Sequence, residues 1–153
     1  MAECPDVPFY ALVDFDPDGI AIMSTYKYGS YALAHENVTA PTSRPLNIPG
    51  LRWLGIKSGQ LTPYTDHRGV THDNTTVDAQ GTMRLTPRDR KKARKMLSGK
   101  ICGENSSEPE WTRELQRMLM LNMKAEMQIL EEQPGGVSGW VKSALGMGES
   151  TQG

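Results

Sequence analysis

The chain has 153 residues, of which 17 are basic, 18 are acidic and 37% are apolar. This composition predicts one globular domain, and its near-zero net charge excludes nucleic-acid binding through overall basicity. Cys4 and Cys102 form no CxxC pair, which argues against a disulfide scaffold. No segment approaches the ~20 apolar residues that span a membrane. The N-terminus lacks a basic start followed by an apolar run, so no signal peptide is expected.

The first half of the chain predicts a strand, a helix and a second strand. Val7 to Val13 form a short apolar run with β-branched and aromatic members, which is typical of a buried strand. The segment Asp14 to Gly19 interrupts this run, and a helix is predicted from Pro17 to His35 because proline suits the first helical position. Leu51 to Ile56 read as another buried strand. Strand, helix and strand at this spacing predict a parallel sheet in an α/β fold.

The second half predicts helices after a polar segment. Residues Lys57 to Arg84 are polar and are expected to form a long surface insertion. Thr86 is a good N-cap for a helix that ends near Gly99, and a last helix is expected from Glu110 to Glu132. We therefore predict one domain at residues 1–134 with an insertion at 57–85, followed by a flexible Gly- and Ser-rich tail at residues 135–153.

The candidate site is the acidic turn Asp14-Phe15-Asp16-Pro17-Asp18-Gly19. In parallel α/β sheets, ligands bind beyond the carboxyl ends of strands, where Asp14 and Asp16 are expected. Two carboxylates can share a hard divalent cation such as Mg²⁺ and leave coordination positions for water or phosphate. Asp18 is expected either to join or to modify this site. The alternative is that Asp16 only caps the helix.

Three other interpretations of the turn are less favoured. An EF-hand loop needs a glutamate at its twelfth position, which is Thr25 here, and a helix before it. A phosphatase with an aspartate nucleophile usually continues Asp-Gly-Thr, where this chain has Asp16-Pro17-Asp18. A dinucleotide-binding loop needs three spaced glycines, and Gly19 stands alone.

Basic residues supply candidate DNA contacts. The predicted helix after Thr86 carries a dense cluster of them, which favours either phosphate binding or an ordinary solvated face. Lys27 opens a basic and aromatic segment that is expected near the acidic turn, and it is expected either to face a phosphate or to be an ordinary solvated lysine. Arg52 is expected to reach either DNA or Asp14. The candidate DNA-binding residues are Lys27, Arg52, Arg88, Arg90, Lys91 and Lys92.

Five ordered strings carry a family resemblance. They are Ala11 to Met23, Tyr26 to Ser30, Gly50 to Ile56, Leu85 to Asp89 and Met123 to Gln128. In this order they resemble the Toprim domain of the family that comprises Spo-eleven and the A-type subunit of topoisomerase VI. The resemblance covers about Val7 to Leu130, and it implies a Toprim-like Rossmannoid parallel sheet flanked by helices.

The resemblance also implies a function. The resemblance implies a protein that cuts double-stranded DNA in meiotic recombination by a type IIB topoisomerase-like transesterification. Such a protein is expected to act as a homodimer with a B-type subunit and accessory proteins. Its expected location is the nucleus, on chromosomes. Magnesium, for which Mn²⁺ can substitute, is held by the two aspartates that match Asp14 and Asp16, together with an earlier glutamate. The tyrosine nucleophile and that glutamate are expected upstream, so no catalytic residue is expected within this chain. A second hypothesis is therefore a non-catalytic fragment or interaction module, and a third is an Asp-x-Asp phosphatase.

Overall fold

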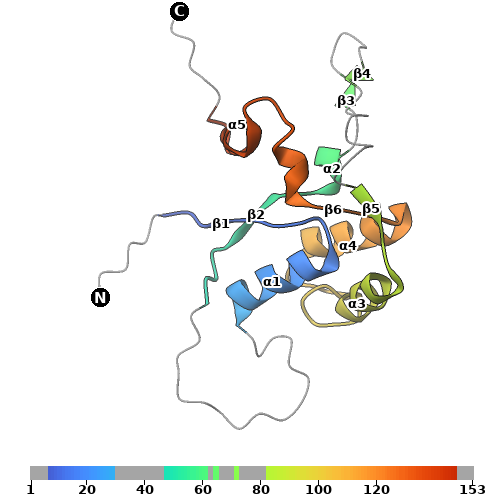
Figure 1. Ribbon diagram of the computed structural model, residues 1–153. Helices are drawn as coiled ribbons and strands as arrows, with labels where there is room; N and C mark the ends of the chain where they lie inside the picture. Colours follow the sequence, from blue (N-terminus) through green and yellow to red (C-terminus); the bar gives the residue numbers. More distant parts are fainter. Residues whose placement is uncertain (1–6, 30–46, 62–63, 66–70, 73–81, 148–153) are drawn as a thin grey trace, which may run out of the picture.

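The structure is a computed structural model that describes residues 7–29, 47–61, 64–65, 71–72 and 82–147, and it has an α/β fold (Figure 1). The elements follow one another as β1 (Tyr10–Leu12), α1 (Pro17–Tyr28), β2 (Arg52–Gly55), α2 (Ser58–Leu61), β3 (Tyr64–Thr65), β4 (Thr71–His72), β5 (Thr82–Arg84), α3 (Pro87–Leu97), α4 (Pro109–Leu121), β6 (Met123–Ala125), the 3-10 helix η3 (Met127–Leu130) and α5 (Gly136–Ala144).

Strands β1 and β2 form the predicted parallel pair. Tyr10 lies opposite Arg52 and Ala11 opposite Trp53, and the register shifts before Leu12. Beyond the strands, the Val13 N–H donates to the carbonyl of Gly55 at 2.8 Å. In the view of Figure 1, α1, α3 and α4 lie below this pair of strands and α5 lies above it. The strand, helix and parallel strand expected from the sequence are confirmed.

Helix α1 begins where the sequence predicts but ends earlier. Asp16 is its N-cap and Pro17 occupies its first turn. The prediction that it continues to His35 is wrong, because the helix ends at Tyr28. Gly29 adopts a φ of 84°, which helices do not allow, while its N–H still bonds to the carbonyl of Thr25. Residues 30–46 lie outside the described part of the chain.

Helix α3 has the predicted start. The Thr86 side chain accepts from the Asp89 N–H at 3.2 Å, and the Asp89 carboxylate accepts from the Thr86 N–H at 2.9 Å. This reciprocal capping box satisfies two backbone donors that the first turn of a helix leaves unpaired. The local sequence signal is therefore sufficient to place this helix.

Helix α4 is shorter than predicted. Instead of running from Glu110 to Glu132, it ends at Leu121, because Asn122 takes a left-handed conformation with a φ of 53°. The chain then continues as β6, which pairs antiparallel with β5. Met118 is fully buried in the core, whereas Met120 is 77% exposed. Helix α4 therefore buries one face, which carries Trp111, Leu115 and Met118, and exposes the other.

Both ends of the predicted polar insertion form regular structure. Its first residues form α2, whose Ser58 N–H donates to the buried Glu114 carboxylate at 2.7 Å. Its last residues form β5, which pairs with β6. Between them, β3 and β4 pair antiparallel, and residues 62–63, 66–70 and 73–81 lie outside the described part.

The prediction of a flexible tail after residue 134 is wrong for residues 136–144, which form α5. Trp140 packs against the core, and a Cβ at Gly55 would clash with its indole ring. Glycine at position 55 therefore leaves the space that Trp140 fills. Residues 148–153 lie outside the described part.

No helix in the described part of the chain is long and apolar enough to cross a membrane.

One apolar cluster among the described residues joins helices to strands. The buried residues of the cluster are Phe15, Ile20, Met23, Trp53, Ile56, Leu61, Leu85, Ala93, Cys102, Trp111, Leu115, Met118, Ala125, Ile129 and Leu130.

Candidate functional site

The acidic turn lies at the carboxyl end of β1, as the sequence predicts. The Asp16 carboxylate accepts from the Gly19 N–H at 2.6 Å, so Asp16 caps α1. The Asp14 carboxylate accepts from the Met127 N–H at 2.8 Å. Each of these hydrogen bonds uses only the Oδ1 atom of its carboxylate. Capping and ligand binding are therefore compatible, since a carboxylate offers about four acceptor positions.

Gly19 allows the turn to close tightly. A Cβ at this position would clash with the carbonyl oxygen of Asp14 and would lie 3.3 Å from Oδ1 of Asp16. Any other residue would push the start of α1 away from the end of β1. Glycine here therefore keeps the two aspartates close together.

The turn concentrates negative charge. Burial raises the pKa of Asp16, and the neighbouring Asp14 and Asp18 carboxylates raise it further. The Gly19 N–H and the Lys124 ammonium group act in the opposite direction on this pKa but do not cancel the rise. A cation bound at this turn would relieve the repulsion among the three carboxylates.

Strand β6 lies against the acidic turn, and the sequence did not predict this strand. Phe15 and Ala125 exchange backbone hydrogen bonds of 2.8 and 3.1 Å. This pairing brings Lys124 beside the turn, where it forms an ion pair of 2.9 Å with Asp89. The sequence assigns no role to Lys124. The left-handed Asn122, a residue type that tolerates this conformation, is the local signal that the chain turns here.

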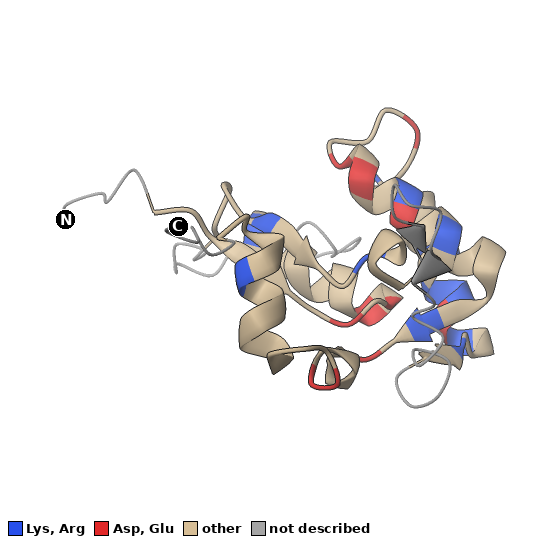
Figure 2. Ribbon diagram, turned by 90° about the horizontal axis from the view of Figure 1, so that it is seen from above, with Lys and Arg blue, Asp and Glu red and all other residues tan. Residues whose placement is uncertain are grey.

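Helix α3 packs against α1, and one of its basic residues, Lys92, lies next to the acidic turn. Figure 2 colours the basic residues blue and the acidic residues red. Lys92 pairs with Asp18, and the Arg90 guanidinium donates to Asn122 at 2.5 Å. These two predicted DNA contacts therefore have protein partners. The exposed basic residues of α3 are Arg88, Lys91, Arg94 and Lys95.

The other two predicted DNA contacts, Lys27 and Arg52, lie elsewhere. Lys27 is in the last turn of α1, about 16 Å along the helix from Asp16. The prediction that it lies near the acidic turn is therefore wrong. Arg52 aligns with Tyr10 at the beginning of the parallel pair, whereas Asp14 follows the end of β1. Arg52 therefore does not reach Asp14.

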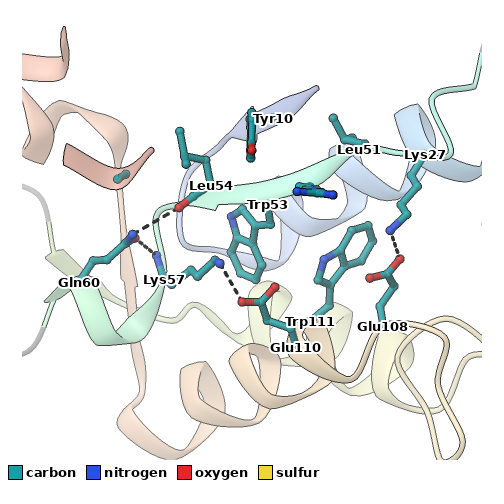
Figure 3. Close-up of a pocket in the computed structure, with 12 residues that line it drawn as sticks. Tyr10, Lys27, Leu51, Trp53, Leu54, Lys57, Gln60, Glu108, Glu110 and Trp111 are labelled. Carbon is teal, nitrogen blue, oxygen red and sulfur yellow. Dashed lines mark hydrogen bonds and ion pairs between the residues drawn. The ribbon is translucent and has the colours of Figure 1, made fainter. Parts of the chain in front are cut away.

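Lys27 and Arg52 instead line a shared pocket of about 500 Å³ between β2 and the start of α4 (Figure 3). Lys27 pairs with Glu108, and Lys57 pairs with Glu110 at 2.7 Å. Trp53 and Trp111 are buried between these two ion pairs. The lysines are largely neutralised by their partners.

The donor set of the acidic turn fits a hard divalent cation. Asp14 and Asp16 are oxygen ligands of the kind that magnesium prefers, and magnesium keeps several waters when few carboxylates bind it. Among the described residues, no group of three or more His, Cys, Asp or Glu side chains converges on one point. The described part of the chain therefore shows no complete protein cage for a metal ion.

A parallel strand pair with an acidic turn at its carboxyl end and helices packed around it defines an α/β domain with a candidate cation site. The family model described as the Toprim domain of Spo11 and of the A subunit of topoisomerase 6 matches residues 1–135, and the chain belongs to this family. The family suggested by the five ordered strings is thus confirmed.

Relatives of both branches match most of the chain. The meiotic recombination protein SPO11-1 of rice (Oryza sativa subsp. indica) is 33% identical over 130 residues, which cover 85% of this chain and 29% of the relative. Human meiotic recombination protein SPO11 is 33% identical over 124 residues, covering 81% and 26%. The A subunit of DNA topoisomerase 6 from Arabidopsis thaliana is 31% identical over 124 residues, covering 81% and 24%. The chain thus spans less than a third of the length of these relatives.

Proposed function

We propose that this chain is the magnesium- and DNA-binding Toprim part of a meiotic double-strand-break protein that resembles the A-type subunit of topoisomerase VI. The observation that carries this proposal is the acidic turn: Asp14 and Asp16 lie at the carboxyl end of β1, and each keeps an oxygen atom outside its backbone hydrogen bond. The family match over residues 1–135 supports the assignment of that turn.

In this proposal, Asp14 and Asp16 hold the metal ion. When bound, magnesium would neutralise charge on a scissile DNA phosphate. The Met127 N–H orients the Asp14 carboxylate, and the Gly19 N–H orients that of Asp16. Two such fixed carboxylates would hold a divalent cation with little reorganisation. Asp18 adds to the negative charge of the site and is paired with Lys92.

The exposed face of α3 is the proposed DNA contact. Arg88 and Lys91 lie on a helix that the Lys92–Asp18 pair attaches to the acidic turn. Positive side chains in this position would bind phosphates on the same duplex that reaches the metal site. A double-strand break needs two cuts, so the proposed working unit is a homodimer on double-stranded DNA in the nucleus. The tyrosine nucleophile, a B-type subunit and the accessory proteins belong to this proposal as partners of the Toprim part.

The test is a titration of the purified chain with MgCl₂ and MnCl₂, followed by calorimetry and thermal unfolding. Asp14→Asn and Asp16→Asn are the informative variants, because an amide oxygen can still accept each backbone hydrogen bond. Glu104→Gln, an exposed carboxylate between α3 and α4, is the matched control. The proposal expects the wild type and the control to bind the cations and both aspartate variants to lose most of the affinity.

Equal affinity in the wild type and in both aspartate variants would contradict the proposal. Absence of any thermal shift at millimolar Mn²⁺ would favour the alternative of a non-catalytic interaction module instead. Binding to a short duplex, measured by fluorescence anisotropy with and without Mn²⁺, gives the second readout. The proposal expects Mn²⁺ to strengthen binding in the wild type but not in the Asp14→Asn variant.

A further inference from the structure

Lys124 is the most enclosed positive charge near the acidic turn in the described part of the chain. It lies on β6, directly before Ala125, whose backbone pairs with Phe15 inside the turn. Its side chain is 19% exposed and that of its partner Asp89 is 8% exposed. The backbone pairing and the ion pair together hold the ammonium group in one place.

The ammonium group of Lys124 is fixed by its contact with Asp89. Oδ2 of Asp89 accepts from the Thr86 N–H at 2.9 Å and also receives Lys124 Nζ at 2.9 Å. The first turn of α3 therefore fixes Asp89, and Asp89 fixes Lys124. The hydrogen bond to Asp89 is the largest cause that raises the pKa of Lys124, and the nearby Asp16 and Asp18 carboxylates raise it further. The side chain thus stays positively charged beside the turn.

We propose that Lys124 is a built-in cation of the acidic turn, which offsets the repulsion among its aspartates and sets how tightly the turn binds a divalent cation and the DNA phosphate that accompanies it. This inference rests on the proposed function and adds a positioning residue to it. A fixed positive charge repels an incoming dication but attracts a phosphate. Lys124 therefore has opposite effects on the two ligands.

This pair of opposite effects separates the proposed role from a structural one. If Lys124 only held β6 in place, its replacement would weaken the binding of both the cation and the DNA. Lys92 provides the comparison, because it also pairs with a carboxylate of the turn but is 34% exposed, and its partner Asp18 is 43% exposed. Solvent screens such an exposed charge, so its effect on the site is smaller.

The experiment measures Mn²⁺ affinity by calorimetry and the affinity for a short duplex by anisotropy, with the full 153-residue chain. For Lys124→Met we expect Mn²⁺ to bind on the order of tenfold more tightly, because one nearby positive charge is removed. Duplex binding in the presence of Mn²⁺ is expected to weaken by about tenfold or more, the factor that one lost hydrogen bond to a charged group represents. Lys124→Arg should stay close to the wild type, and Lys92→Met should change Mn²⁺ affinity less than Lys124→Met.

Two further variants keep the test decisive. Lys124→Met leaves the Asp89 carboxylate buried without its partner, which can destabilise the fold. The double variant Asp89→Asn with Lys124→Met removes both charges, and it should still bind Mn²⁺ more tightly than Asp89→Asn alone. Unchanged Mn²⁺ affinity in both backgrounds, or a parallel loss of both ligands, would overturn the role of Lys124. If the wild type itself bound no Mn²⁺, both this inference and the proposed function would fail.

Discussion

The carboxylate of Asp14 accepts a hydrogen bond of 2.8 Å from the backbone N–H of Met127, which lies 113 residues further along the chain. This bond connects the end of β1 to the first residue of η3. Together with the pairing of Phe15 and Ala125, it holds the acidic turn against β6. The aspartate that is the first candidate metal ligand is therefore also part of the tertiary structure.

Replacement of Asp14 should separate these two roles. Asp14→Ala removes the acceptor for the Met127 N–H and should lower the free energy of unfolding by about 1 kcal/mol. Asp14→Asn keeps an acceptor oxygen and should unfold close to the wild type in urea, although it loses divalent-cation binding. Equal stability of the alanine and asparagine variants would show that the hydrogen bond contributes nothing to the fold.

Asp16 should behave differently because it caps α1 and repels its neighbours. Asp16→Ala loses the cap and should cost about 1 kcal/mol of unfolding free energy. Asp16→Asn can retain the cap. Because burial and the neighbouring carboxylates raise the pKa of Asp16 in the folded state, the wild type loses stability as pH rises from the unfolded value of 3.8 through the folded pKa.

Without divalent cations, Asp16→Asn should therefore be at least as stable as the wild type at neutral pH. Urea unfolding at pH 7 in the presence of a chelator measures this comparison. Clear destabilisation of the asparagine variant under these conditions would contradict the assigned direction of the pKa shift.

The Asp89–Lys124 pair should make stability depend on pH in the acidic range. Burial acts to raise the pKa of Asp89, but hydrogen bonds from Lys124 and Thr86 outweigh it and hold the pKa below the usual value of 3.8. The contribution of Asp89 is therefore present above pH 3.8 and is lost as pH falls through the lower, folded-state pKa. Asp89→Asn should cost about 2 kcal/mol at pH 7.

The cost of Asp89→Asn should shrink as pH falls below about 3.8, since the wild-type carboxylate then becomes protonated as well. Unfolding by urea at several pH values measures this convergence. Lys124 remains charged over this range, because its pKa is raised above 10.5 by the hydrogen bond to Asp89. A cost that does not change between pH 7 and pH 2 would contradict the ion pair.

The exposed basic residues of α3 predict a specific salt dependence of DNA binding. Arg88→Gln and Lys91→Gln should each weaken duplex binding for all sequences and reduce the salt slope by about 1. Lys27→Gln is the matched control, because Lys27 pairs with Glu108 in the pocket away from α3. Anisotropy titrations at several salt concentrations measure the slopes. If Lys27→Gln reduced the slope as much as the α3 variants, the proposed DNA face would be misplaced.

Helix α5 should depend on Trp140. None of its residues is fully buried, and Trp140 is its partly buried member that packs against the core. Trp140→Ala should therefore loosen α5, with a loss of about 2 kcal/mol, and should make residues 135–147 sensitive to limited proteolysis. Val137→Ala changes an exposed residue of the same helix and serves as the control. Equal protection of both variants would show that other contacts hold α5.

Local signals in the sequence predict the elements that depend on neighbouring residues. The apolar run before Asp14 predicts β1, and the capping box of Thr86 and Asp89 predicts α3. The acidic turn can also be predicted, because aspartate is favoured as the N-cap of a helix and proline at its first position. These features need no contact with distant parts of the chain.

Elements that depend on distant partners could not be predicted in this way. Strand β6 interrupts what reads as one helix, and its partners are β5 and Phe15. Helix α5 depends on the fit of Trp140 over Gly55. The position of Lys124 follows from both β6 and Asp89, so its place beside the turn could not be read from the sequence.

Asp16 is both the N-cap of α1 and a proposed metal ligand, and this affects how relatives are compared. A copy of this domain that bound no metal ion would still favour a side-chain oxygen at this position, because that oxygen accepts from the Gly19 N–H in the first turn of α1. Aspartate at this position is therefore compatible with a copy that binds no metal ion. Serine, threonine or asparagine at this position is the informative exchange, since each can cap the helix but brings no negative charge. Such a substitution would mark relatives that keep the helix cap without the proposed metal ligand.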